Sequence, residues 1–207
     1  FEWLEEHHPE FLMLLREMVR RKQVELLGGG FYSPILSLLP DGDKLGQIEK
    51  LTTYLRTTFG VRPRGGWLTE RVWEPPLARI LRNSGLEYTF LDDRHFHIAG
   101  IGPEDCYGAY LAEEQGKTIL VLPIRNALVE MVPQASPAEM LQSLRDLARE
   151  QDGRVVVLLV DGERLGEREG SNRICYQEKW LATFFELLEA NREWLEPLTP
   201  RLEEKVL

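Results

Sequence analysis

The amino-acid sequence predicts an α/β fold with a largely parallel sheet, and three observations support this. Short apolar runs alternate with amphipathic helical segments along the whole chain, as in parallel strands joined by helices. The run 155–160 is apolar throughout, which is typical of a strand buried on both faces. Acidic residues directly follow several of these runs, at the edge where parallel sheets build their active sites.

The elements are expected in the following order. A first helix is expected over 9–22, where apolar residues recur at helical spacing. Further helices are expected around 48–55 (closed by Gly60), 77–81 (ending near Gly85), 138–148 and 177–190. Strands are expected over 24–27, 65–69, 88–91, 118–122 (stopped by Pro123) and 155–160.

These strands, about five, are too few to close a barrel of seven or eight, and an open barrel would expose strand edges. The first residues, Phe1-Glu2-Trp3, include neither an initiator Met nor the basic start of a signal peptide. We therefore expect residues 1–207 to be one catalytic segment of a barrel. It is expected to lack the first strand, the C-terminal part of the barrel and the helical region that follows.

Composition restricts the possible partners. The net charge of -9 argues against nucleic acid and anionic membranes, because both need a basic surface. The longest apolar run has the length of a strand and is too short to span a membrane. Cys106 and Cys175 have neither the number of a disulfide framework nor metal-ligand spacing, so reduced thiols in the cytoplasm are expected. The oligomeric state is left open.

The first candidate acid, Glu70, follows the expected strand 65–69. Trp67 and Trp73 flank it, and Arg71 is adjacent. Aromatic faces stack on the apolar faces of sugar rings, and a neighbouring arginine keeps a carboxylate ionised. The alternative interpretation is that both tryptophans belong to the core and that Glu70 pairs with Arg71 on the surface.

The second candidate acid, Asp161, follows the run 155–160. A carboxyl group at the end of a buried strand is poorly solvated, which favours the protonated form that a general acid needs. In retaining glycosidases the two carboxyl groups lie about 5–5.5 Å apart. The sequence predicts only that Glu70 and Asp161 share one sheet edge. The alternative is that Asp161 is a helix N-cap or turn residue before Gly162.

Three stretches of the chain, in order, resemble motifs of glycoside hydrolase family 57. They are residues 25–32 (Glu-Leu-Leu-Gly-Gly-Gly-Phe-Tyr), 67–75 (Trp-Leu-Thr-Glu-Arg-Val-Trp-Glu-Pro) and 161–166 (Asp-Gly-Glu-Arg-Leu-Gly). The stretch 91–96 fits the same family. This family contains 4-α-glucanotransferases, α-amylases and amylopullulanases, and the middle motif is closer to the glucanotransferase and amylase members than to the branching enzymes.

The resemblance implies a retaining double displacement on α-glucans or maltooligosaccharides. The implied scaffold is a (β/α)7 distorted TIM-like barrel with its site at the C-terminal ends of the parallel strands, and without metal or organic cofactor. It implies that Glu70 is the nucleophile and Asp161 the general acid/base. It also implies substrate contacts from Glu25, Trp67 and His95.

The sequence departs from the family pattern in three places. The opening His-Gln-Pro motif is absent, and the late motif would lie beyond Leu207. After Asp161 the family usually has Glu-Lys-Phe-Gly followed by Trp-Pro, whereas Arg168 stands at the tryptophan position here. Loss of one stacking platform costs on the order of 1–3 kcal/mol, so we expect altered specificity rather than lost chemistry.

Two other functions were weighed. A carbohydrate-binding relic without catalysis would fit the altered run after Asp161. A metal-dependent deacetylase or mannosidase would use Asp92, Asp93, His95 and His97, because a His-x-His on a strand places both rings on one face. We prefer the interpretation in which one histidine hydrogen-bonds within the site and the other is exposed. Linkage, chain length and the ratio of hydrolysis to transfer are left open.

Overall fold

The computed structural model describes residues 1–150 and 153–199. The chain divides into two compact units. Phe1–Leu91 and Ala109–Val121 make up most of the first unit, and Asp92–Gly108 and Leu122–Pro197 make up the second. Within the described residues, none of the helices is both long enough and apolar enough to cross a membrane.

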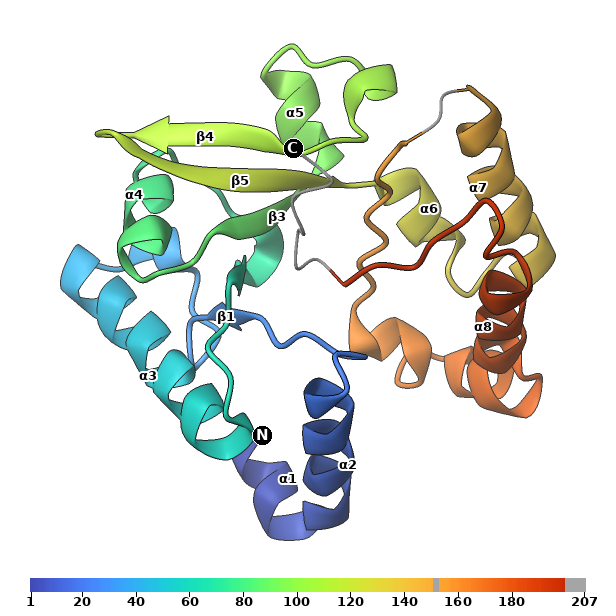
Figure 1. Cartoon of the computed structure of the whole chain (residues 1–207), viewed down its shortest axis with the longest axis horizontal. Coiled ribbons are helices and arrows are strands. Elements are labelled where there is room, and N and C mark those ends of the chain that lie inside the picture. The colour runs from blue at the N-terminus through green and yellow to red at the C-terminus, as the bar shows by residue number, and fades with distance from the viewer. Residues whose placement is uncertain (151–152, 200–207) are drawn as a thin grey trace. The chain divides into compact units, whose positions relative to one another are not determined.

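A five-stranded sheet organises the first unit. Its strands are β1 (Gly28–Gly29), β2 (Gly65–Trp67), β3 (Tyr88–Asp92), β4 (Tyr110–Glu114) and β5 (Lys117–Ile124), in the order β1-β2-β3-β5-β4 (Figure 1). The pairs β1–β2 and β2–β3 are parallel, and the hairpin β4–β5 is antiparallel. The predicted α/β class is confirmed.

Helices cover this sheet. The first unit contains α1 (Glu2–His7), α2 (Pro9–Arg20), η1 (Leu36–Leu38), α3 (Asp41–Phe59), η2 (Thr69–Arg71) and α4 (Pro76–Asn83). α3 packs against β1, and α4 against β4 (Figure 1). Ile48 and Leu55 lie seven positions apart on one face of α3, and both are fully buried. α3 ends where Gly60 adopts a left-handed φ of 73°, so the predicted helix stop is confirmed.

The second unit is helical. It contains α5 (Asp93–Ile98), η3 (Pro103–Asp105), α6 (Asn126–Met131), α7 (Pro137–Glu150), η4 (Gly162–Leu165), the π-helical η5 (Arg173–Gln177) and α8 (Trp180–Ala190). α7 and α8 lie side by side (Figure 1). The core of the unit consists of Leu128, Val132, Met140, Trp180 and Phe184. α7 confirms the helix predicted over 138–148. The helix predicted from 177 begins at Trp180, because Lys179 before it has a left-handed φ of 59°.

The prediction of a buried strand over 155–160 was wrong. These residues are half-buried, and only Val157 forms a bridge, parallel to Ile124. The amide of Val155 donates to the carbonyl of Tyr107 at 2.9 Å, and the amide of Arg125 donates to the carbonyl of Val157 at 3.1 Å. The backbone groups of this segment therefore reach separate partners, and no continuous ladder of a strand forms over the described residues.

The first strand is shifted relative to the prediction. Residues 24–27 belong to no helix or strand, and β1 is formed by Gly28 and Gly29 instead. A Cβ atom on Gly29 would lie 2.5 Å from the carbonyl oxygen of Trp67. The close approach of β1 to β2 therefore requires a residue without a side chain at position 29.

The hairpin was also missed. β4 and β5 are joined by Gln115 and Gly116, whose φ angles of 51° and 74° are those of a two-residue hairpin turn. β5 continues past Pro123, which was expected to stop it. The pairing with β4 already ends at Val121, opposite Tyr110, so Pro123 removes no hydrogen bond from that side.

Candidate active site

The strand register places candidate residues on one face of the sheet. Gly29 pairs with Trp67, and Gly65 pairs with Tyr88. Because side chains alternate along a strand and paired residues share a face, Trp67, Tyr88 and Asp92 lie on the same face. We call it the inner face. Glu70 follows β2 and Asp93 follows β3, so each of these two strands is followed by an acidic residue, as predicted.

Glu70 lies in a strained turn directly after β2. Glu70 and Arg71 both have positive φ angles, 56° and 55°, which are uncommon in residues other than glycine. Leu68, 1% exposed, anchors the turn, and its carbonyl accepts the amide of Arg71 at 2.9 Å. The turn leaves the Glu70 side chain exposed at the C-terminal end of the sheet. Backbone strain of this kind costs of order 1–3 kcal/mol per residue and concentrates at functional sites.

Trp67, the last residue of β2, accompanies Glu70. The guanidinium carbon of Arg71 lies 5.8 Å from the centre of the Trp67 ring, in a cation–π arrangement. Trp67 and Trp73 are half-buried, and neither is among the fully buried residues of the described core. An aromatic ring therefore ends the strand that leads into the Glu70 turn, and aromatic rings of this kind stack on sugar rings.

Glu25 lies before β1, toward the N-terminal end of the strands. Its Oε1 accepts a hydrogen bond from the hydroxyl of Tyr88 at 2.7 Å. Its Oε2 is buried and has no hydrogen-bond partner among the residues that the structure describes. Burial, and next the hydrogen bond to Glu25, raise the pKa of the Tyr88 phenol well above its usual range, so that hydroxyl stays a donor. Sequence reasoning missed Tyr88, which carried no signal beyond being an aromatic residue in a strand.

Asp92 and Asp93 differ in their surroundings. Asp92 ends β3, and its Oδ2 lies 3.8 Å from the Arg94 guanidinium. Asp93 begins α5, is 6% exposed and is bound by Asn126 and Arg125. Asn126 and Arg125 could not be predicted as partners of Asp93, because they lie more than thirty positions further along the chain.

His95 and His97 lie on α5, not on a strand, so the geometry behind the metal-enzyme alternative was wrong. Two positions apart on a helix, the rings face different directions. His95 is half-buried and His97 is exposed. In the described part of the chain, no three His, Cys, Asp or Glu side chains are grouped so that they could hold a metal ion.

Asp161 immediately precedes η4 and is half-buried. Its carbonyl accepts the amide of Arg164 at 3.1 Å. Asp161 therefore occupies the N-cap position of η4, as the alternative interpretation of this residue proposed. Within the described turn, its side chain makes no capping hydrogen bond. Asp161 belongs to the second unit and Glu70 to the first.

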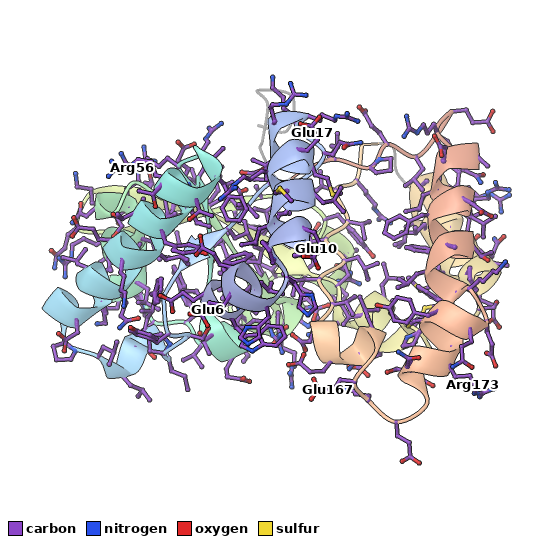
Figure 2. The ribbon with its side chains drawn as sticks, turned by 90° about the horizontal axis from the view of Figure 1, so that it is seen from below. Glu6, Glu10, Glu17, Arg56, Glu167 and Arg173 are labelled. Carbon is purple, nitrogen blue, oxygen red and sulfur yellow. The ribbon has the colours of Figure 1, made fainter. Side chains whose placement is uncertain are left out.

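Arg168 is exposed in the turn after η4, next to Glu167, which Figure 2 labels. The carbonyl of Glu163 accepts its amide at 2.8 Å, and its own carbonyl accepts the Ser171 hydroxyl at 2.6 Å. The backbone of this turn is thus held in place, while the side chain that replaces the expected aromatic platform extends into solvent.

Comparison with known proteins identifies the family. The family model of glycosyl hydrolase family 57 matches residues 1–204. "Alpha-amylase 1" of Dictyoglomus thermophilum is 43% identical over 189 residues, 91% of this chain and 28% of that protein. The 4-alpha-glucanotransferase of Thermococcus litoralis is 38% identical, over 97% of this chain and 31% of that protein.

The crystal structure of the Thermococcus litoralis 4-alpha-glucanotransferase superimposes with a TM-score of 0.91, over 96% of this chain and 31% of that chain. This chain thus spans less than a third of the length of these relatives. The match of the family model over nearly every residue and the shared fold lead to one conclusion: the chain belongs to glycosyl hydrolase family 57.

Proposed function

We propose that the protein containing this chain is a retaining glycoside hydrolase or transglycosylase that acts on α-glucans. The observation that carries the proposal is the strained turn after β2, which leaves Glu70 exposed three residues after the half-buried Trp67 that ends the strand. Membership of family 57 and relatives named α-amylase and 4-α-glucanotransferase support the same reaction class.

In the proposed double displacement, the Glu70 carboxylate attacks the anomeric carbon, and the carboxyl group of Asp161 donates its proton to the departing glycosidic oxygen. The covalent glycosyl–enzyme bond to Glu70 is then broken by water or by a sugar hydroxyl, and Asp161 takes back a proton. Water gives hydrolysis, and a sugar hydroxyl gives transfer. The anomeric configuration is retained in both.

The proposed substrate is a maltooligosaccharide or a longer α-glucan. Trp67 supplies a stacking surface, and Glu25 and His95 supply polar contacts. The proposed scaffold is a (β/α)7 barrel of which this sheet forms part. We also propose a cytoplasmic location, supported by the free Cys106 and Cys175, both buried. We propose no partner other than the glucan, and therefore neither nucleic acid nor a membrane. We also propose no metal or organic cofactor.

The test is incubation of the full-length protein with maltotriose, with the products separated by chromatography. A ladder of longer oligosaccharides indicates a transferase, and glucose with maltose indicates a hydrolase. Glu70→Ala and Asp161→Asn are each expected to abolish turnover. Retained activity in both variants would contradict the assignment of the two acids.

A carbohydrate-binding relic is the second candidate, favoured by the exposed Arg168 where the family pattern has a tryptophan. It predicts that the full-length protein binds maltooligosaccharides, measured by calorimetry, but leaves them unchanged. Turnover of maltotriose by the unaltered protein excludes this candidate.

A further inference from the structure

We propose that Tyr88 is a positioning residue, which holds the Glu25 carboxylate in place on the inner face of the sheet. The proposal rests on the proposed function, in which Glu25 contacts the glucan. Tyr88 acts through Glu25 and is not assigned a contact with the sugar itself.

The Tyr88 ring is itself immobilised. It is 2% exposed and packs edge-on against Phe90, with 5.6 Å between the ring centres. A tyrosine side chain has only two rotatable bonds between the backbone and the ring plane, so a packed ring fixes the position of its hydroxyl. That hydroxyl lies 2.7 Å from Glu25 Oε1.

Gly65 allows the ring to reach Glu25. Tyr88 begins β3, and Glu25 precedes β1, with β2 between the two strands. Gly65 is the β2 residue paired with Tyr88, and a Cβ atom on it would lie 2.3 Å from Cε2 of the ring. The ring thus lies directly against the Gly65 backbone and crosses β2 where no side chain obstructs it.

The two Glu25 oxygens have different environments. Oε1 accepts the Tyr88 hydroxyl, whereas Oε2 is buried and unpartnered among the described residues. A buried acceptor without a partner is unfavourable and is retained mainly where function requires it. Because Tyr88 fixes one oxygen, it also determines where the other points, and that second oxygen keeps its capacity to accept a hydrogen bond.

The nearby charges leave this contact intact. Arg64, next to Gly65, pairs with Glu87 rather than with Glu25: its Nε donates to Glu87 Oε2 at 2.8 Å. Arg64 donates this hydrogen bond, and the bond is the largest cause of the raised pKa of Arg64. Tyr88 is therefore the donor that orients Glu25.

The test is a double-mutant cycle in the full-length protein with maltotriose as substrate. Tyr88→Phe removes the hydroxyl and keeps the ring. It is expected to lower kcat/KM about tenfold or more, as loss of one charge-assisted hydrogen bond does. Glu25→Gln is expected to lower kcat/KM at least as much. The double variant is expected to be no worse than Glu25→Gln alone, because Tyr88 then has nothing to position.

Tyr54→Phe is the matched control, since the Tyr54 hydroxyl also donates to a glutamate, Glu5 Oε2, at 3.3 Å, but on α3. It is expected to leave kcat/KM unchanged. Melting temperatures of all variants show whether a lower kcat/KM comes from a less stable fold. If the role of Tyr88 were purely structural, the effect of Tyr88→Phe on kcat/KM would not depend on whether Glu25 is present.

Two results would overturn the proposal. One is a kcat/KM of Tyr88→Phe within twofold of the unaltered protein. The other is a double variant whose fold-loss in kcat/KM equals the product of the fold-losses of the two single variants. If Tyr88→Phe does not fold, Glu25→Gln decides, since unchanged kcat/KM there leaves nothing to position. The proposed function fails separately, by absence of maltotriose turnover in the unaltered protein or by its persistence in Glu70→Ala.

Discussion

Asp93 Oδ1 accepts a hydrogen bond from Asn126 Nδ2 at 3.0 Å, and its Oδ2 accepts the backbone amide of Asn126 at 3.3 Å. The same Oδ2 lies 3.3 Å from the guanidinium of Arg125. Asp93 thus satisfies the first amide of α6 and neutralises the half-buried guanidinium of Arg125. An acid that follows a strand, and therefore looks catalytic in the sequence, has a structural role here.

Asp93→Ala is expected to destabilise the full-length protein by about 2–4 kcal/mol, because it leaves the half-buried Arg125 without its counter-charge and removes the acceptor of Asn126. Asp93→Asn, which keeps an acceptor for Asn126, should cost less. Denaturant unfolding measures both. The control is Asp146→Ala, which removes the exposed pair with Arg149 and should cost at most about 1 kcal/mol. Equal effects of Asp93→Ala and Asp146→Ala would contradict the structural role.

The positive φ of Glu70 costs conformational free energy. Replacing Glu70 should therefore affect stability and activity differently. Both Glu70→Ala and Glu70→Gly are expected to be inactive on maltotriose. Glu70→Gly should be more stable than Glu70→Ala by about 1 kcal/mol, because glycine adopts a φ of 56° without strain. Thermal unfolding of the two variants measures the difference. Equal stability would show that the turn is not strained at this residue.

Gly29→Ala should destabilise the protein by more than about 2 kcal/mol, through backbone strain and steric overlap. The φ of Gly29 is 140°, and the added Cβ would meet the Trp67 carbonyl, which is backbone and cannot move aside alone. Gly46→Ala is the control: it lies within α3 with no atom within 4 Å of the new methyl group. It should stabilise by about 0.5–1 kcal/mol. Opposite signs in denaturant unfolding are the expected result.

Arg168→Trp restores the aromatic residue of the family pattern. If a sugar binds beside this exposed position, stacking should lower KM for longer maltooligosaccharides roughly tenfold, since one platform is worth about 1–3 kcal/mol. Glu169→Trp, the exposed neighbour, is the control and should leave KM unchanged. Equal KM values for Arg168→Trp and the unaltered protein would show that position 168 is outside the substrate path.

Asp41 gives a pH-dependent contribution to stability. Two hydrogen bonds lower the pKa of Asp41 below the ordinary 3.8; the bond from Lys44 has the larger effect, and the bond from Arg79 the next largest. A lowered carboxyl pKa stabilises the fold fully above the unfolded value, and this contribution is lost as pH falls through the folded value. Asp41→Asn should therefore lower the melting temperature near neutral pH. The difference from the unaltered protein should shrink below 3.8. Asp43→Asn, in the same helical turn, is the control.

Local sequence patterns predicted most helices but fewer strands. The spacing of Ile48 and Leu55 and the stop at Gly60 sufficed for α3, because helical hydrogen bonds and caps involve neighbours in the chain. β1 was predicted a few residues too early, β4 was missed, and 155–160 was wrongly predicted as a strand. Strand pairing depends on partners far away in the sequence, such as Trp67 for Gly29. An apolar run does not indicate with which segment it will pair.

By itself, the sequence determined the α/β class, the family and the candidate acids Glu70 and Asp161, because these depend on residue order and local motifs. Only the tertiary structure decided that Glu70 and Arg71 adopt left-handed backbone angles, and that Asp93 serves Asn126 and Arg125. It likewise decided that the Tyr88 hydroxyl holds Glu25. The contacts of Asp93 and of Tyr88 depend on atoms from distant segments being packed to within a hydrogen bond's length. No pattern of neighbouring residues specifies that distance.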